Sequence, residues 1–135
     1  MTYKLGTRSK ENLKGLHPDL VKVVERAIQI TDQDFTVIEG LRTTKRQQEL
    51  YAQGRTKPGN IVTKADGVKN KSNHQAKSDG YGHAVDIVPY PVDWDSKSKF
   101  ENISVAMLKA AKELGVNIEW GGNWKFVDMP HFELK

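Results

Sequence analysis

The chain has 135 residues, of which 37% are hydrophobic and 28% charged, and its formal net charge is +4. This length is typical of one globular domain with its own core, so we expect a single domain over residues 1–135. Because the chain contains no cysteine, disulfides, thiolate metal sites and a cysteine nucleophile are excluded. No stretch approaches the roughly 20 apolar residues that cross a bilayer, and no secretory signal is visible. We therefore expect a protein made in the cytoplasm, without stable membrane insertion.

The first half of the chain predicts two helices around one strand. After a polar N-terminal stretch, apolar residues recur at helical spacing over residues 17–30. Residues 34–40 alternate between apolar and polar side chains, which predicts a strand. A short helix is expected over residues 45–54, capped by Thr43 or Thr44.

The middle of the chain is irregular. Residues 55–82 are rich in Gly, Lys, Asn and Ser, and only residues 60–63 resemble a strand. A long irregular stretch inside a small domain is usually functional or disordered. Residues 83–90 then predict a buried strand.

The last third of the chain predicts one more helix, over residues 95–115, and two short strands, over residues 117–122 and 131–135. The apolar stripe expected on the inner face of this helix consists of Phe100, Ile103, Met107, Leu108, Ala111 and Leu114. The order of elements predicts an α+β fold, with helices packed on a small, mostly antiparallel sheet.

The candidate metal ligands are histidines and one carboxylate. Asp86 lies in an apolar strand, where a carboxylate is costly to bury unless it is paired or bound to a metal, although alternation can also point it to solvent. His131 directly follows a proline, but a lone histidine is more often a structural hydrogen-bonding group. Together with His74 or His83, these residues offer two imidazoles and a carboxylate, which suits a catalytic zinc with an open fourth position.

Two further side chains complete this hypothesis. Asp128, three residues before His131, can accept a proton from a water and pass it to a leaving amine. Arg42, at a strand-to-helix turn, can stabilise negative charge on the former carbonyl oxygen. Alternatively, Arg42 is a surface residue that pairs locally.

Three stretches, "GLRTTKRQQELYAQGRTKPGNIVT", "SNH…GYGHAVDIVPY" and "EWGGNWKFVDMPHFEL", resemble the zinc peptidases of the D-Ala-D-Ala carboxypeptidase/dipeptidase clan, peptidase family M15. The similarity is strongest to the phage endolysin branch, the L-alanyl-D-glutamate endopeptidases that cut peptidoglycan stem peptides, and it runs from about residue 18 to the C-terminus. It implies a Hedgehog/DD-peptidase-like fold, one catalytic zinc ion and peptidoglycan as the substrate.

The resemblance also assigns residues. The histidine of the family's S-x-H element falls on His74, after Ser72, and the aspartate of A-[VI]-D falls on Asp86. The C-terminal D-x-x-H element gives His131 as the third zinc ligand and Asp128 as the catalytic carboxylate.

The resemblance also suggests residues around the substrate. Arg42 falls on the arginine that binds the scissile carbonyl, and Gln47 falls where relatives carry a glutamine that faces the pocket. With Gln47, the expected substrate-binding residues are Ser72, Trp120 and Trp124; the two tryptophans are candidates to wall the groove, or equally to lie in the core.

The sequence departs from the family pattern between its first two ligands. Relatives have six residues between them, whereas eleven separate His74 from Asp86, which indicates an insert over Gln75–Asp79. His83 is therefore an alternative ligand if the loop folds differently. Residues three apart on a strand point to opposite faces, and this favours His74.

The leading hypothesis is a monomeric zinc endolysin that cleaves the L-alanyl-D-glutamate bond and reaches the wall after a holin-type protein permeabilises the membrane. A D,D-carboxypeptidase or D-Ala-D-Ala dipeptidase would use the same chemistry on another bond. A non-catalytic, metal-stabilised wall-binding domain would not need Asp128. A nucleic-acid-binding protein would explain neither the histidines nor Arg42, so we expect no nucleic acid partner.

Overall fold

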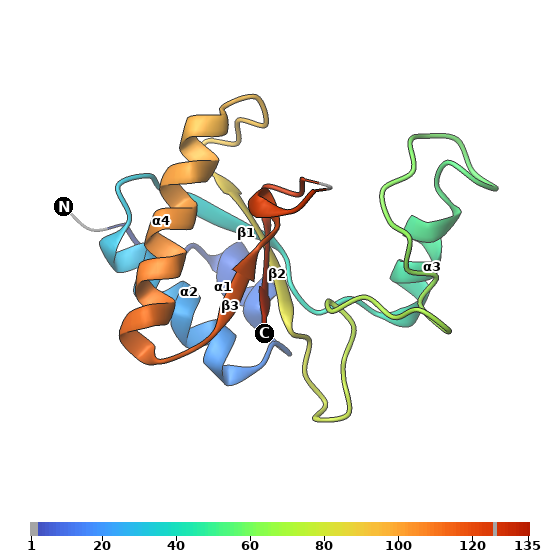
Figure 1. Ribbon diagram of the computed structural model, residues 1–135, viewed down its shortest axis with the longest axis horizontal. Coiled ribbons are helices and arrows are strands. Elements are labelled where there is room, and N and C mark those ends of the chain that lie inside the picture. Colours follow the sequence, from blue (N-terminus) through green and yellow to red (C-terminus); the bar gives the residue numbers. More distant parts are fainter. Residues whose placement is uncertain (1–2, 126) are drawn as a thin grey trace.

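The computed structural model describes residues 3–125 and 127–135. The described residues form an α+β fold, as the sequence predicts, with one four-stranded sheet in the order β1-β2-β4-β3 and every neighbouring pair antiparallel (Figure 1). The elements are, in chain order, α1 (Thr7–Leu13), α2 (Pro18–Ile30), β1 (Phe35–Glu39), α3 (Thr44–Ala52), β2 (Ala84–Pro89), α4 (Lys97–Leu114), β3 (Ile118–Trp120), the 3-10 helix η1 (Gly121–Asn123) and β4 (His131–Leu134).

The two faces of the sheet have different roles. Side chains alternate along β2, so Val85 and Ile87 enter the hydrophobic core with Phe132 of β4. That core is completed by the apolar faces of α2 and α4, which lie side by side (Figure 1). Asp86, between the two core residues, points to the opposite face, where the sheet carries polar groups.

The helix α3 and the long connection after it form a lobe that stands apart from the sheet and the other helices (Figure 1). The hydroxyl of Thr43 caps α3 by accepting a hydrogen bond from the backbone N–H of Arg46 at 3.1 Å, as the sequence predicts. The expected strand over residues 60–63 is wrong, because this segment makes no ladder with another strand.

Two other differences concern helices. The polar N-terminal stretch contains α1, which the sequence did not reveal because only Ser9 and Leu13 of this short helix are buried. In α4, Leu108 and Leu114 were expected to face the core but are 39% and 44% exposed. Small alanines take the inward positions instead, since α2 packs closely against α4.

Among the described residues, no helix combines the length and the apolar character needed to span a bilayer.

Candidate active site and metal centre

His74, Asp86 and His131 lie together on the polar face of the sheet, and one donor atom from each falls within 4.8 Å of the other two. Asp86 Oδ1 is 3.3 Å from His74 Nε2 and 3.4 Å from His131 Nδ1. Asp86 and His131 are direct partners in the pairing of β2 with β4, so their side chains share a face. His74 reaches them from the loop before β2.

The orientation of His74 is fixed by backbone groups. Its Nδ1 lies 2.9 Å from the carbonyl oxygen of Gly40, which can only accept, so Nδ1 carries the hydrogen and Nε2 offers its lone pair. Gly40 is required here because a β-carbon would collide with the backbone oxygen of Asn12 in α1. The hydroxyl of Ser72 also accepts a hydrogen bond from the backbone N–H of His74 at 3.1 Å.

A carboxylate fixes the orientation of His131. Its Nε2 donates to Glu133 Oε1 at 2.7 Å, which leaves Nδ1 for a metal. Glu133 is held in turn by the side-chain amide of Asn73, which donates to Oε2 at 2.8 Å. Outer hydrogen bonds of this kind fix the tautomer and ring position of metal-binding histidines.

The donor set suits a metal ion. Asp86 Oδ1 is buried and has no hydrogen-bond partner among the described residues, although two imidazole nitrogens lie close to it. Donors about 2.0–2.1 Å from a tetrahedral ion lie roughly 3.3–3.4 Å from one another, which agrees with both nitrogen–oxygen distances. An ion between the three donors would satisfy this buried oxygen.

The charges of Asp86 and His131 depend on each other. Burial alone would raise the pKa of Asp86, but the imidazoles of His131 and His74 outweigh it and hold the pKa well below the usual range of a carboxyl. Burial would also lower the pKa of His131, but Asp86 and Glu133 raise it to about 9. Without a metal, the site therefore holds a proton on His131 at neutral pH.

Asp128 lies beside this cluster, with its Oδ2 3.9 Å from His131 Nδ1, and it remains partly exposed. Burial and then the negative charge of Asp86 raise the pKa of Asp128, which suits a group that exchanges protons. Its backbone N–H donates to the carbonyl of Gly121 at 2.9 Å. A β-carbon on Gly121 would collide with the backbone of Asp128, so the glycine permits this close approach.

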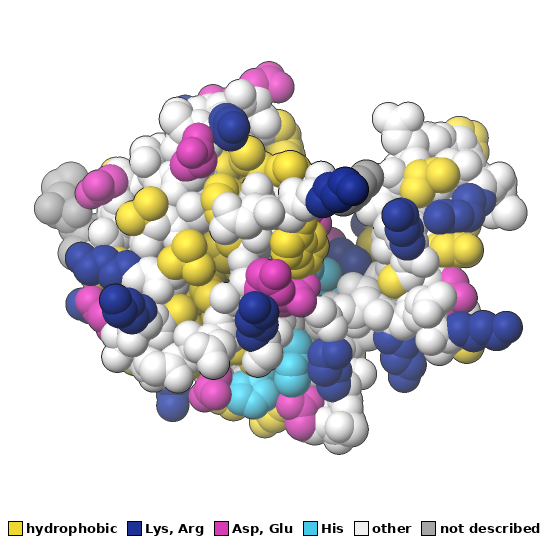
Figure 2. All heavy atoms as spheres, in the orientation of Figure 1, with side chains coloured by type: hydrophobic (Ala, Val, Ile, Leu, Met, Phe, Trp, Pro, Cys, Tyr) yellow, Lys and Arg dark blue, Asp and Glu magenta, His cyan; other side chains and the backbone are white. Residues whose placement is uncertain are grey.

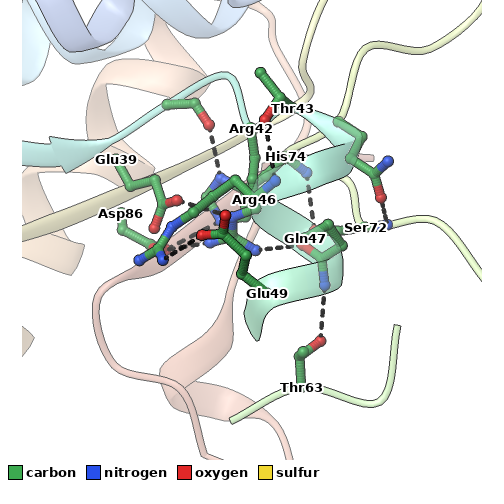
Figure 3. Close-up of polar contacts among 12 residues, drawn as sticks. Glu39, Arg42, Thr43, Arg46, Gln47, Glu49, Thr63, Ser72, His74 and Asp86 are labelled. Carbon is green, nitrogen blue, oxygen red and sulfur yellow. Dashed lines mark hydrogen bonds and ion pairs between the residues drawn. The ribbon is translucent and has the colours of Figure 1, made fainter. Parts of the chain in front are cut away.

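Arg42 is fixed by a network of polar side chains (Figure 3). Its Nε donates to Glu39 Oε1 and its Nη1 to Gln47 Oε1, both at 2.8 Å. A bulge in β1 places Glu39 opposite Asp86, on the polar face. The remaining nitrogen, Nη2, lies 3.8 Å from Asp86 Oδ2, so the guanidinium is directed toward the candidate metal centre.

A cleft of about 540 Å³ contains these groups and lies between the sheet and the lobe that carries α3 (Figure 2). Leu50 and Val62 line it from the lobe. Trp124 lines it near the metal centre, with its ring centroid 5.0 Å from that of His131, and Trp94 lines it from the loop before α4. Trp94 is 59% exposed.

Three residues expected to bind substrate lie behind the cleft surface or support other groups. Gln47 is fully buried and orients Arg42, with its own amide donating to the carbonyl of Ala65 at 2.8 Å. Trp120 packs in the core, where its Nε1 donates to the carbonyl of Met129 at 2.7 Å. Ser72 lines the cleft but also positions His74.

The insert folds away from the cleft, since none of residues 75–82 lines it. The backbone N–H of His83 donates to the carbonyl of Asn73 at 2.7 Å, which closes the insert into a loop without displacing His74. The side chain of His83 bonds Asp79 at 2.7 Å and packs against His17, with ring centroids 5.3 Å apart. His74, and not His83, therefore meets Asp86.

Glu133, Glu39, Asn73 and Trp94 were not singled out from the sequence. Glu133 carried a usable signal, because a residue two positions after His131 on a strand lies on the same face. Glu39 can be placed on the same face as Asp86 only when the bulge in β1 is known. No local pattern identifies Asn73 or Trp94.

Comparisons with known proteins identify a family and several relatives. Residues 1–134 match a protein family described as phage L-alanyl-D-glutamate peptidase. The chain is 30% identical, over its whole length and 91% of the relative, to the L-alanyl-D-glutamate peptidase of Escherichia phage T5. It is 38% identical over 110 residues to the peptidoglycan L-alanyl-D-glutamate endopeptidase CwlK of Bacillus subtilis, of whose length the match covers 60%.

A solved structure is also similar. The L-Ala D-Glu endopeptidase ChiX of Serratia marcescens superposes with a TM-score of 0.74 and 36% sequence identity, over 99% of this chain and 91% of that one.

Proposed function

Since the chain belongs to the phage L-alanyl-D-glutamate peptidase family, we propose that it is a zinc-dependent endolysin that hydrolyses the L-alanyl-D-glutamate bond of peptidoglycan. The observation that carries this proposal is the convergence of His74, Asp86 and His131 on a buried, unpaired carboxylate oxygen, beside Asp128 and Arg42. The names of the three relatives described above support the choice of bond.

Zinc is the ion that best suits these donors. Two imidazoles and one carboxylate leave a fourth position open, which is the ligand number of catalytic zinc sites. When bound, the ion supplies a Lewis acid that polarises the scissile carbonyl and lowers the pKa of a water molecule. His74 and His131 present their lone pairs because Gly40 and Glu133 hold their other ring nitrogens.

Asp128 is the proton carrier in this proposal. Its position next to His131, without being one of the three converging donors, allows it to take the proton of the attacking water and deliver it to the leaving amine. Partial burial raises the pKa of Asp128 and so increases its affinity for a proton. This suits both the uptake of a proton from water and its delivery to the leaving amine.

Arg42 stabilises the negative charge that develops on the carbonyl oxygen. Glu39 and Gln47 hold two of its nitrogens, so the direction of Nη2 is set before substrate binds. We therefore propose that Gln47 and Glu39 position the arginine, while Arg42 itself contacts the reacting group.

The substrate chain would lie along the cleft, over the metal centre. Trp124 and Trp94 give this cleft an aromatic wall, and Val62 and Leu50 give the facing wall aliphatic side chains. Trp120 supports the loop that carries Asp128, because its indole donates to the carbonyl of Met129.

A monomer is the active form in this proposal, because one cleft of a single chain brings together the three candidate ligands, Asp128 and Arg42. Membership of a phage family supports action on the wall after a holin-type protein has opened the cytoplasmic membrane.

The test is to digest purified peptidoglycan and to identify the new amino termini. The proposal predicts new N-terminal D-glutamate. Release of D-alanine alone would assign the chain to a carboxypeptidase or dipeptidase activity and overturn the choice of bond.

A further inference from the structure

The positive charge of this protein is concentrated on one part of the fold. We define the basic lobe as residues 44–71, which comprise α3 and most of the irregular connection after it. Its basic residues are Lys45, Arg46, Arg55, Lys57, Lys64, Lys69 and Lys71, and its acidic residues are Glu49 and Asp66. Seven basic and two acidic residues give the lobe +5, whereas the whole chain carries +4, so all other residues together carry −1.

These charges face solvent and are largely uncompensated. All seven basic side chains are exposed, and Figure 2 shows Lys and Arg gathered over the lobe. Among the described residues, Arg46 is the only one of the seven in an ion pair, with Glu49 at 3.7 Å. The carboxylate of Asp66 accepts three backbone N–H groups of its own loop instead of pairing with a lysine.

The lobe also forms part of the candidate active site. Leu50, Gln53, Val62 and Thr63 line the cleft that contains the metal centre. A polymer that enters this cleft therefore passes along the lobe that carries these lysines. Electrostatic attraction between exposed charges extends over about 8 Å at physiological ionic strength. The lobe therefore also attracts anionic groups of the substrate that lie outside the cleft.

We propose that the basic lobe is an electrostatic docking surface for peptidoglycan, and that it holds the free carboxylates of stem peptides adjacent to the one being cut. This inference rests on the proposed function. D-glutamate has two carboxyl groups, and only one of them continues the peptide, so a polymer of stem peptides presents carboxylates at regular intervals. Many weak contacts to such a polymer add up, whereas a single short peptide engages few of them.

Two triple variants distinguish the effect of where the positive charge lies from the effect of the total net charge. Lys57→Glu/Lys64→Glu/Lys69→Glu reverses three exposed lysines of the lobe, outside the candidate catalytic groups. Lys22→Glu/Lys97→Glu/Lys109→Glu is the control, because it changes the net charge equally on exposed positions of α2 and α4. Both are assayed on sacculi stripped of teichoic acid and on a soluble stem peptide, and binding to sacculi is measured by co-sedimentation.

We expect the lobe variant to bind and digest sacculi about tenfold less well at low ionic strength, while its cleavage of the soluble peptide is unchanged. The control variant should bind and digest sacculi like the wild type. Added salt should lower the binding and digestion of sacculi by the wild type towards the values of the lobe variant. Equal losses in the two triple variants, no loss in the lobe variant, or failure of the wild type to bind stripped sacculi would each overturn the inference. If the wild type binds sacculi through the lobe but cleaves neither substrate, the proposed function fails and the docking surface stands.

Discussion

Asp86 and His131 face each other across the pairing of β2 with β4, with Asp86 Oδ1 3.4 Å from His131 Nδ1. This relationship depends on sheet register, because a shift of one residue would turn one of the two side chains into the core. His74 completes the group from a loop, where the carbonyl of Gly40 sets its ring orientation. Two strands and one loop thus create a site at whose centre Asp86 Oδ1 is buried and has no hydrogen-bond partner among the residues that the structure describes.

Asp128 provides the most direct test of the proposed proton transfer. Asp128→Asn preserves the size of the side chain but removes its ability to accept a proton, so kcat should fall by about 10²–10⁴-fold. Zinc content and melting temperature should remain those of the wild type. Asp95→Asn, at an exposed position before α4, is the control. Undiminished lysis by the Asp128 variant would refute the mechanism.

Glu133 should control metal affinity without being a ligand. Glu133→Gln removes the negative charge that holds His131 Nε2–H, and zinc should bind about 10–100-fold more weakly. Glu119→Gln is a matched control, since Glu119 is the partner of Glu133 in the pairing of β3 with β4 but lies outside the cleft lining. Competition with a chromogenic chelator measures both affinities, and equal affinities would show that Glu133 does not support the site.

The stability of the metal-free protein should decrease with rising pH. The pKa of His131 is raised to about 9 in the folded protein, against about 6.5 in an unfolded chain. Its stabilising contribution is therefore complete below pH 6.5 and is lost as the pH rises through 9, by at most about 1.4 kcal/mol per pH unit. Urea unfolding of chelated protein between pH 6.5 and 9 measures this slope.

His131→Asn should remove most of that slope. Zinc must displace the same proton, so the affinity of the wild type for zinc should increase over the same pH range. A metal-free wild type whose stability is constant from pH 6.5 to 9 would contradict this assignment of the proton.

Removal of the metal should lower the melting temperature and abolish activity together. A ligand that binds only the folded state stabilises it by roughly 4 kcal/mol at a thousand times its dissociation constant. Chelated protein should therefore melt at a lower temperature, and added zinc should restore both properties. Full activity after exhaustive chelation would exclude a catalytic metal.

Local patterns were sufficient to predict the α+β class, because alternation and helical spacing are strong in β2, α2 and α4. They did not predict α1, whose residues are mostly exposed, or the exposure of Leu108 and Leu114, which depends on how closely α2 approaches α4. The candidate ligands were predicted from motifs. Two supporting residues were not predicted: Asn73, which holds Glu133, depends on the closure of a loop, and Glu39, which holds Arg42, depends on a bulge, and no local pattern specifies either.

The choice between the two histidines beside the insert tests the metal centre most directly. Zinc content should be one ion per chain in the wild type and in His83→Ala, whose imidazole bonds Asp79 away from the cluster. It should fall to near zero in His74→Ala at the same protein concentration. Zinc retained by His74→Ala and lost by His83→Ala would contradict the proposed metal centre.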